Sequence, residues 1–403
     1  GSPGSEEEVI EELKGLFNEA VRLRLASDVP LGAFLSGGVD SSAVVASMAG
    51  VMGKEPVKTA TIGFSEKRFD EMEYARMVAG QYQTDHTEFV VNPDALDVLE
   101  DIVWHLDEPF ADASAIPTYY VSKMARQKVT VALSGDGGDE IFAGYVNRYY
   151  MNRLEGSIRE KLPFFFREKI LGRFAEIYPR VDYLPRPFRL KRFLSNLSHS
   201  FEQAYFRDMS FYFLPEMKKK LYRPEFQTAV KDFNACDILG DHFRANQNSD
   251  STTRVQYVDI KTYLPEDILV KVDRMSMAHS LEVRAPILDH KLMEYVGSLP
   301  STFKLKGKES KYVFKKMLEG QLPPNILYRK KQGFSVPLAS WLRNEMKGFV
   351  EATLFSSQSG LSSFFDVQYI KDLWKQHLIC RQYYAYPLWG ILMFSLWQKK
   401  FLR

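Results

Sequence analysis

The chain has 403 residues, of which 45% are hydrophobic, and its formal net charge is +2. This composition supports a large packed core, which excludes an intrinsically disordered chain, and the near-neutral charge argues against nucleic acid as a partner. The two cysteines, Cys236 and Cys380, are too far apart in the sequence for a CxxC site or a disulfide framework, which favours a reducing, cytoplasmic compartment.

The first 150 residues alternate between helical and strand patterns. Residues 1–5 (GSPGS) are interpreted as a cloning scar. Apolar residues at helical spacing over 6–26 predict an amphipathic helix, and Ser5 and Glu8 have the spacing of a capping box at its start. The elements predicted next are strand 31–35, helix 41–49, strand 57–64, helix 71–81, strand 86–91, helix 94–106, helix 117–126 and strand 128–133. This alternation predicts a parallel sheet with helices on both faces.

Beyond about residue 145 the strand patterns fade, and helix-compatible patterns predominate. Residues 6–150 are therefore predicted to form an α/β core, and residues 151–403 a mainly helical region that completes the same unit. The most apolar stretch, residues 385–397, is shorter than the roughly 20 apolar residues of a membrane span. It is predicted to be a buried terminal helix, and no membrane partner is expected.

A turn rich in glycine and serine, Ser36–Ser42 (SGGVDSS), follows the first predicted strand. Glycines let the backbone approach an anion closely, and the start of a helix offers unpaired N–H groups and a positive dipole end. The serine hydroxyls can donate to phosphate oxygens. Asp40 would repel a phosphate unless a divalent cation lies between them, and hard oxygen ligands suit Mg²⁺. The alternative is a turn that only caps a helix.

A second turn, Ser134–Glu140 (SGDGGDE), repeats this composition after strand 128–133. Its grouped acidic side chains need a cation or an opposing base in order to coexist. Because ligands bind at the carboxyl ends of parallel strands, the two turns are predicted to face each other and to hold one metal between Asp40 and Asp139. A solvated acidic loop is the alternative.

The complete SGGVDSS string resembles the pyrophosphate loop (PP-loop) of the ATP-pyrophosphatase superfamily, which binds ATP and releases AMP and pyrophosphate. The Walker pattern GxxxxGK(S/T) is absent, which argues against ordinary γ-phosphoryl transfer. Over nearly residues 6–400 the chain resembles the C-terminal synthetase domain of class-B-type, glutamine-hydrolysing asparagine synthetases. The strings that carry this resemblance are SDVPLGAFLSGGVDSS, TIGF, DEPFADASAIPTYY, LSGDGGDEIFAGY, DRMSMAHSLEVRAPILDH, GKESKYVFKK and KKQGFSVPLASWL.

The resemblance implies a parallel five-stranded sheet of the adenine nucleotide alpha hydrolase-like type, followed by a largely helical C-terminal half. It also implies nucleotide contacts for particular residues. Leu35 and Ile62 would hold the adenine and ribose of ATP, and Ser134 and Gly135 would contact the nucleotide near its α-phosphate. The pyrophosphate would be bound by Ser36, Gly37, Gly38, Asp40, Ser41 and Ser42. Asp40 and Asp139 would be the Mg²⁺ ligands.

Two residues receive catalytic roles from the resemblance. Asp136 stands where some relatives carry Glu, and this acid would help to form the adenylate and later handle the ammonia proton. Lys311 matches the lysine that neutralises the charge building on the α-phosphate, where preorganised positive charge contributes most. A single lysine is ordinarily a solvated surface group, and other lysines lie close by, at 308, 315 and 316, so only the family string singles out Lys311.

The implied reaction activates a small-molecule carboxylate, the side chain of L-aspartate, as its adenylate, and ammonia then converts it to asparagine with release of AMP. Full-length relatives produce the ammonia in an N-terminal glutaminase domain with a terminal cysteine nucleophile. No such cysteine is present, so the chain is interpreted as an excised synthetase fragment. A homodimer is a possible oligomeric state, and the sequence does not decide it.

Three alternatives remain. The same chemistry could serve another acceptor, as in sugar-acid amidotransferases and peptide or β-lactam-type cyclases. An RNA-modifying relative that adenylates a base is disfavoured by the near-neutral charge and the lack of a cysteine pair. A nucleotide-binding protein without catalysis is disfavoured because Asp40, Asp139 and Lys311 are all present.

Some polar residues of the matching strings have two interpretations. Glu108, Asp112 and Ser114 could face the substrate or cap local turns. Arg274 and Arg284 could clamp a carboxylate, but ion pairs with neighbouring aspartates, at 273 or 289, are favoured. Residues 331–333 are interpreted as a loop over the nucleotide.

Overall fold

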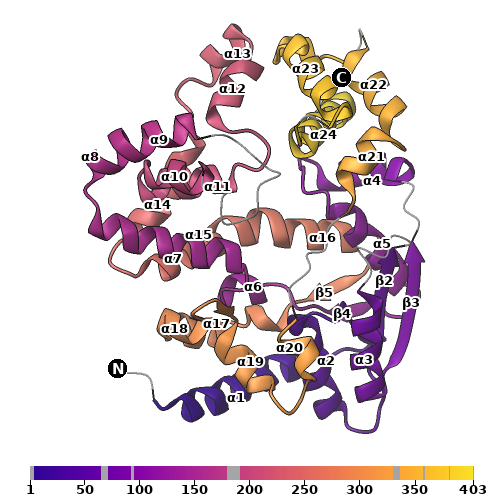
Figure 1. Ribbon diagram of the computed structural model, residues 1–403. Coiled ribbons are helices and arrows are strands. Elements are labelled where there is room, and N and C mark those ends of the chain that lie inside the picture. The colour runs from indigo at the N-terminus through magenta and orange to yellow at the C-terminus, as the bar shows by residue number, and fades with distance from the viewer. Residues whose placement is uncertain are drawn as a thin grey trace.

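A five-stranded parallel sheet forms the centre of the protein, with the strand order β3-β2-β1-β4-β5 (Figure 1). The computed structural model describes residues 4–64, 71–91, 95–178, 191–329, 336–356, 359–380 and 382–402. Residues 331–333, interpreted above as a loop over the nucleotide, lie outside these ranges.

The elements in the first part of the chain are α1 (Glu6–Arg24), β1 (Leu31–Phe34), α2 (Val39–Met52), β2 (Lys58–Phe64), α3 (Met72–Tyr82), β3 (Asp85–Val91), α4 (Ala95–Leu106), α5 (Ala115–Ala125), β4 (Val131–Leu133), α6 (Gly138–Ile141), α7 (Val146–Lys161), α8 (Phe164–Phe166), η2 (Arg167–Leu171), α9 (Gly172–Ile177), α10 (Lys191–Leu197), α11 (Phe201–Met209), α12 (Pro215–Leu221) and α13 (Pro224–Ala229).

The later elements are α14 (Ala235–Ala245), α15 (Ser251–Lys261), η4 (Leu264–Leu269), α16 (Val270–Met277), β5 (Glu282–Arg284), η5 (Pro286–Leu288), α17 (His290–Ser298), α18 (Ser301–Lys304), β6 (Leu305–Lys306), β7 (Glu309–Ser310), α19 (Tyr312–Leu318), α20 (Pro324–Leu327), α21 (Leu338–Arg343), α22 (Lys347–Phe355), η6 (Leu361–Ser363), α23 (Val367–Leu378) and α24 (Ala385–Phe401).

The predicted elements of the first 150 residues are confirmed with shifts of a few residues at their ends. Helix α1 begins with a capping box, in which the Ser5 hydroxyl accepts from the Glu8 amide and the Glu8 carboxylate accepts from the Ser5 amide. The apolar stretch 385–397 lies in α24, most of whose side chains are buried. Among the described residues, no helix is both long and apolar enough to cross a membrane.

The sequence pattern did not place strand β5, nor the short hairpin of β6 and β7. Strand β5 pairs in parallel with β4, with Val131 opposite Glu282 and Leu133 opposite Arg284. The strand patterns were expected to fade beyond about residue 145, and that expectation is wrong at this point. A three-residue strand is too short to show an alternation of apolar and polar residues. The sheet therefore takes its fifth strand from the mainly helical half.

Two apolar clusters cover the opposite faces of the sheet. One joins α1, α2 and α3 to α17, α19 and α20, and Leu35 is buried in it. The other joins α4 and α5 to α16, α21, α22, α23 and α24, and Ile62 is buried in it. Figure 1 shows the first group below the sheet and α21–α24 above it. This is the predicted arrangement of helices on both faces.

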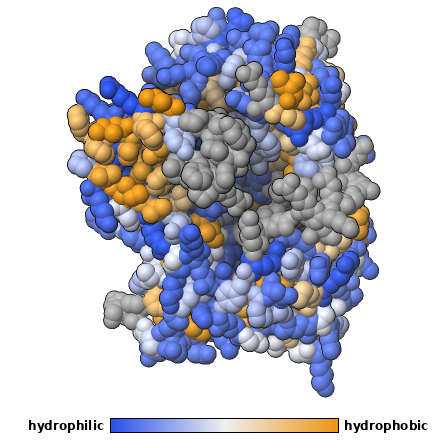
Figure 2. Space-filling model, viewed as in Figure 1, coloured by the Kyte–Doolittle hydropathy of each residue, from blue (hydrophilic) through white to orange (hydrophobic). Residues whose placement is uncertain are grey.

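A third group of helices, α7 with α11, α14 and α15, lies beside the sheet and has its own small core. Buried Asp259 of α15 ties this group together, because it accepts hydrogen bonds from Arg148 at 3.0 Å, from Tyr149 at 2.7 Å and from Tyr205. At the outer edge of the group, α8 and α9 expose an apolar surface, visible as the orange area on the left of Figure 2.

Candidate active site

The two glycine-rich turns leave the sheet at the point where the chain reverses its order of strands. Strand β1 pairs with β2 on one side and with β4 on the other, with Leu31 opposite Val131 and Ala33 opposite Leu133. The residues after β1 and after β4 therefore emerge side by side from the carboxyl edge of the sheet. Such a switch point is where open parallel sheets bind their ligands.

The first turn is shaped by Gly37 and by hydrogen bonds among its own residues. Gly37 has a φ of +70°, and a Cβ there would lie 2.7 Å from the amide nitrogen of Ala75, so only glycine fits. The Ser36 and Ser41 hydroxyls are 3.0 Å apart, and the Gly38 amide donates to the Ser36 hydroxyl at 3.3 Å. Helix α2 starts directly behind, which directs its positive end at the turn.

The second turn packs directly against the first. A Cβ on Gly135 would lie 2.7 Å from the Ser41 amide nitrogen and from the Asp40 Cβ, and a Cβ on Gly138 would collide with the Asp40 carboxylate. This close approach confirms the prediction that residues 36–42 and 134–140 face each other. The glycines of the second turn are required because no side chain fits between the two backbones.

Lys311 bridges the two turns from a distant part of the sequence. Its ammonium forms ion pairs with Asp40 and, at 2.8 Å, with Asp139. The residue precedes α19 with a φ of +55°, and its amide donates to the Phe142 carbonyl at 3.0 Å. Burial alone would lower the pKa of Lys311, but Asp139 and Asp40 outweigh it and raise the pKa above its ordinary value. The lysine therefore stays charged inside the site.

Asp136 lies in the second turn with no ion pair of its own among the described residues. Burial raises the pKa of Asp136, Ser134 and Lys271 oppose this rise, and the charges of Asp40 and Asp139 add to it. A raised pKa makes a carboxylate a stronger base than that of an ordinary aspartate. This property fits the predicted role in proton handling.

The donors available for a divalent cation are the Asp40 and Asp139 carboxylates. They already share one cation, the Lys311 ammonium, which shows that both can face a single positive charge. The described residues contain no group of three or more His, Cys, Asp or Glu side chains arranged to hold a metal. Two carboxylates therefore fit Mg²⁺ only together with phosphate oxygens and water, as Mg²⁺ commonly binds in nucleotide sites.

The remaining predicted nucleotide contacts are placed as follows. The side chains of Leu35 and Ile62 belong to the two different apolar clusters, on opposite faces of the sheet. They cannot together sandwich a base, so a shared adenine contact would have to use backbone groups. The Leu35 amide already donates to the Ala60 carbonyl at 2.9 Å.

Ser42 is fully buried, and its hydroxyl has no hydrogen-bond partner among the described residues.

Arg329 is a site residue that sequence reasoning missed. It donates to the Gly37 carbonyl at 3.2 Å and forms an ion pair of 2.6 Å with Glu71, while its guanidinium lies over the Tyr74 ring. It therefore ties the first turn to α3 and to the residue before it. No local pattern marks this arginine, since its partners are more than 250 residues away in the sequence.

Lys271 is a second missed residue. It is buried, and its ammonium lies 2.6 Å from the Asp112 carboxylate, which also accepts from the amide and hydroxyl of Ser114. The turn-capping interpretation of Asp112 and Ser114 is thus confirmed, with a lysine as an unexpected partner. Asp267 lies beside this pair, and burial together with Asp112 raises its pKa to about 7.

Arg274 and Arg284 make ion pairs, the interpretation that the sequence analysis favoured over a carboxylate clamp. Their partners differ from the predicted ones. Arg284 lies 2.6 Å from Glu282 and also donates to the Arg24 carbonyl. Asp289 pairs with Arg24 at 3.0 Å instead. Arg274 lies 3.9 Å from Asp107. The expected partners, Asp273 and Asp289, are therefore wrong for both arginines.

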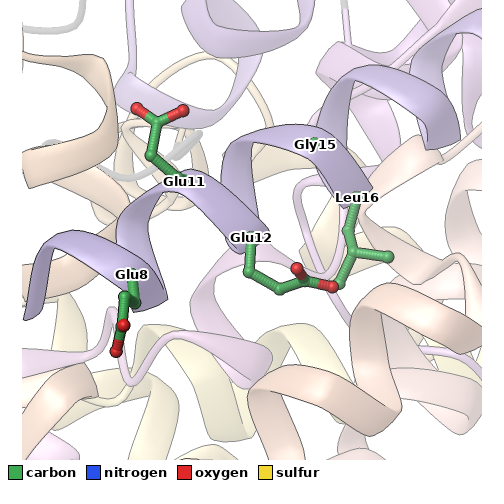
Figure 3. Close-up of a pocket in the computed structure, with 5 residues that line it drawn as sticks. All are labelled: Glu8, Glu11, Glu12, Gly15 and Leu16. Carbon is green, nitrogen blue, oxygen red and sulfur yellow. The ribbon is translucent and has the colours of Figure 1, made fainter. Parts of the chain in front are cut away.

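A separate hollow, shown in Figure 3, lies along α1 and contains none of the predicted site residues. It is lined by Glu8, Glu11, Glu12, Gly15 and Leu16. Its carboxylates would repel a nucleotide. The strand-end turns therefore remain the candidate active site.

Comparison with known proteins assigns the chain to a family. The family model described as Asparagine synthase matches residues 12–399. Asparagine synthetase (glutamine-hydrolyzing) 1 of Bacillus subtilis (strain 168) is 33% identical over 399 residues, covering 97% of this chain and 59% of the relative. Asparagine synthetase (glutamine-hydrolyzing) 3 of the same organism is 30% identical over 344 residues, covering 81% of this chain and 48% of the relative.

A relative with lower identity is named as an amidase, not as an asparagine synthetase. Amidase chyE of Penicillium rubens (strain ATCC 28089 / DSM 1075 / NRRL 1951 / Wisconsin 54-1255) is 26% identical over 382 residues, covering 84% of this chain and 54% of the relative. The chain spans less than two thirds of the length of each of these curated relatives. The family match extends over nearly the whole chain, and the chain belongs to the asparagine synthase family.

Proposed function

We propose that the chain is a ligase that uses ATP to adenylate a carboxylate and then transfers ammonia to it. The observation that carries this proposal is the contact between the two strand-end turns, with Lys311 between Asp40 and Asp139. Glycine-rich backbone, a helix start and a buried cation at one switch point form a site for a triphosphate. The family membership favours adenylation over γ-phosphoryl transfer.

In the first step, an oxygen of the substrate carboxylate attacks the α-phosphorus of ATP, and pyrophosphate leaves. The turn Ser36–Ser42 holds the pyrophosphate portion, and Lys311 offsets the negative charge that develops on the α-phosphate. Asp40 and Asp139 would hold Mg²⁺, which supplies further positive charge to the phosphates. Positioning and charge stabilisation are the main contributions of a protein to such displacements.

In the second step, ammonia attacks the acyl carbon, the C–O bond to AMP breaks, and the new amide nitrogen loses a proton. The Asp136 carboxylate accepts this proton, which its raised pKa favours. A glutaminase domain supplies the ammonia in the whole protein, and free ammonium salts replace that supply for the chain alone.

The proposed acceptor is the side chain of L-aspartate, as the names of the two Bacillus subtilis relatives suggest. A relative named as an amidase supports a second candidate, the same chemistry on another carboxylate. Magnesium as the metal and the cytoplasm as the compartment belong to the same proposal. The two free cysteines are consistent with a reducing compartment.

Product identification tests the proposal. The chain is incubated with ATP, Mg²⁺, ammonium chloride and one carboxylic acid at a time, and the products are identified by mass. AMP, pyrophosphate and asparagine are expected with L-aspartate. If the amide of a different acid forms instead, that acid is the acceptor and the second candidate function holds. Formation of ADP would contradict adenylation altogether.

A further inference from the structure

Three charged side chains gather close to the second strand-end turn. The Lys271 ammonium lies 2.6 Å from the Asp112 carboxylate, and Lys271 as a whole is only 7% exposed. Lys271 and Asp136 each influence the pKa of the other, so this group and the proton-handling carboxylate share one part of the site. The group, called the charged cluster below, consists of Asp112, Asp267 and Lys271.

Asp267 is the member of the charged cluster that lacks a counter-charge of its own. Its Oδ1 atom is buried and has no hydrogen-bond partner among the described residues. Burial, followed by the charge of Asp112, raises the pKa of Asp267 to about 7, and Lys271 opposes this rise only in part. Buried charges are ordinarily paired or hydrogen-bonded. The cluster can therefore accept one more positive charge.

The two cations near Asp267 are already engaged by other aspartates. Lys271 pairs with Asp112. Arg148 donates to Asp259 at 3.0 Å, and its guanidinium lies over two tyrosine rings. Neither cation can turn to Asp267 without leaving a buried aspartate unpaired, which is costly. In the part of the chain that the structure describes, no cation is left for Asp267, but a bound ligand can supply one.

The backbone that carries Asp267 is also of an unusual kind. Element η4 (Leu264–Leu269) is a π-helix, and it leads directly into α16, which carries Lys271. Such π-helical turns are rare and occur frequently at functional sites. Asp112 is fixed from another segment, because its carboxylate accepts from the amide and the hydroxyl of Ser114 at 2.9 and 2.7 Å. Two separate segments therefore hold the charged cluster in place.

An ammonium group suits Asp267 better than a metal ion does. Only two carboxylates meet in the charged cluster, and one of them already binds Lys271. No group of three or more His, Cys, Asp or Glu side chains suited to a metal occurs among the described residues, whereas Mg²⁺ and Ca²⁺ need many oxygen ligands. A primary ammonium donates strong hydrogen bonds to a carboxylate. An acidic amino acid carries this group a few bonds away from its side-chain carboxylate.

We propose that Asp267 binds the ammonium group of the acceptor, with the pair of Asp112 and Lys271 fixing the position of Asp267. The enzyme then takes amino acids that have a side-chain carboxylate and rejects carboxylic acids that lack an amino group. This inference rests on the proposed function, because the bound ammonium would direct the other end of the acceptor to Asp136 and Lys311. It narrows the range of acceptors by excluding hydroxy acids and sugar acids.

ATP–pyrophosphate exchange with matched acids tests the inference. L-Malate is L-aspartate with a hydroxyl in place of the ammonium, and L-2-hydroxyglutarate is related to L-glutamate in the same way. In the pair that exchanges faster, kcat/KM for the amino acid should exceed that for the hydroxy acid at least about a hundredfold, because the hydroxy acid leaves Asp267 unpaired. Equal or faster exchange with the hydroxy acid would overturn the inference.

The variant Asp267→Asn tests the residue itself. Its kcat/KM for the amino acid should fall about a hundredfold, mainly through KM, because the lost contact is made before and during the reaction alike. Its kcat/KM for the hydroxy acid should stay within about threefold of the wild type, since that acid makes no ammonium contact. General damage to the fold would lower both values together. Asp273→Asn, an exposed aspartate of α16, is the control and should keep the wild-type ratio.

Two failures can be told apart. Exchange by Asp267→Asn with an unchanged ratio between amino acid and hydroxy acid would overturn the inference and leave adenylation standing. Absence of exchange by the wild type with every acid tested would overturn the proposed function, and this inference with it. Asp267→Asn should melt no lower than the wild type, because the substitution removes an unpaired buried charge.

Discussion

The ammonium of Lys311 lies 2.8 Å from the carboxylate of Asp139 and pairs with Asp40 as well, so one buried lysine bridges both strand-end turns. The proposed metal would use the same two carboxylates. Lysine and metal then compete for them in the absence of nucleotide, and arrival of the metal with ATP would release the lysine toward the α-phosphate.

Lys311→Met is expected to lower ATP–pyrophosphate exchange by about two to three orders of magnitude, because charge on the α-phosphate is no longer offset. The same variant should bind Mn²⁺, used as a spectroscopic substitute for Mg²⁺, about tenfold or more tightly without nucleotide, since a competing charge is removed. Exchange assays and Mn²⁺ titration by electron paramagnetic resonance measure the two effects. Lys316→Met is the control, because Lys316 lies in α19, the helix that Lys311 precedes, and pairs with Glu319 outside the site. Unchanged Mn²⁺ affinity in Lys311→Met would contradict the competition.

Asp40→Asn should reduce magnesium-dependent exchange by at least one to two orders of magnitude. Loss of one charge-assisted contact costs about 1.5–3 kcal/mol, and loss of a metal ligand should cost more. The fold should persist because Lys311 keeps its ion pair with Asp139. Exchange is measured over a range of Mg²⁺ concentrations, with exposed Asp28→Asn as the matched variant. Normal turnover by Asp40→Asn would show that the metal is held by other residues.

Gly135→Ala should push the two turns apart. Its Cβ would lie 2.7 Å from the Ser41 backbone nitrogen, and backbone cannot move aside as a flexible side chain can. Such overpacking typically costs 1–3 kcal/mol, so the variant should lose exchange activity and melt at a lower temperature. Gly15→Ala in α1 meets nothing within 4 Å and should stabilise the helix by roughly 0.5–1 kcal/mol. Equal behaviour of the two variants would argue against the close approach.

Glu155 predicts a dependence of stability on pH that is separate from the site. Burial raises its pKa from 4.5 to about 7, although Arg159 and Asn196 oppose the shift. A carboxyl with a raised pKa in the folded state contributes its stability fully below pH 4.5 and loses it as the pH rises through 7. This loss amounts to at most about 3.4 kcal/mol. Urea unfolding at pH 5 and pH 8 measures it, and Glu155→Gln should reduce the difference. A pH dependence that Glu155→Gln leaves unchanged would assign the effect to other buried acids, such as Asp267.

The sequence by itself determined the alternating elements from α1 to β4 and the two strand-end turns. Helical spacing, capping residues and glycine-rich strings are local signals, and they depend on neighbours within a few residues. The family strings also selected Lys311 and Asp136 as candidates. The positions of β1 and β4 made the contact of the turns predictable, because parallel strands carry their carboxyl ends to one edge.

Only the tertiary structure decided which distant residues meet. Strand β5 is three residues long and joins the sheet through hydrogen bonds to β4, so its own sequence contains no alternation to detect. Arg329, Lys271 and the pairing of Lys311 with two carboxylates arise from segments separated by more than 150 residues. Packing likewise fixed the faces to which Leu35 and Ile62 turn. It also fixed the exposed apolar surface of α8 and α9, because exposure depends on what the rest of the chain covers.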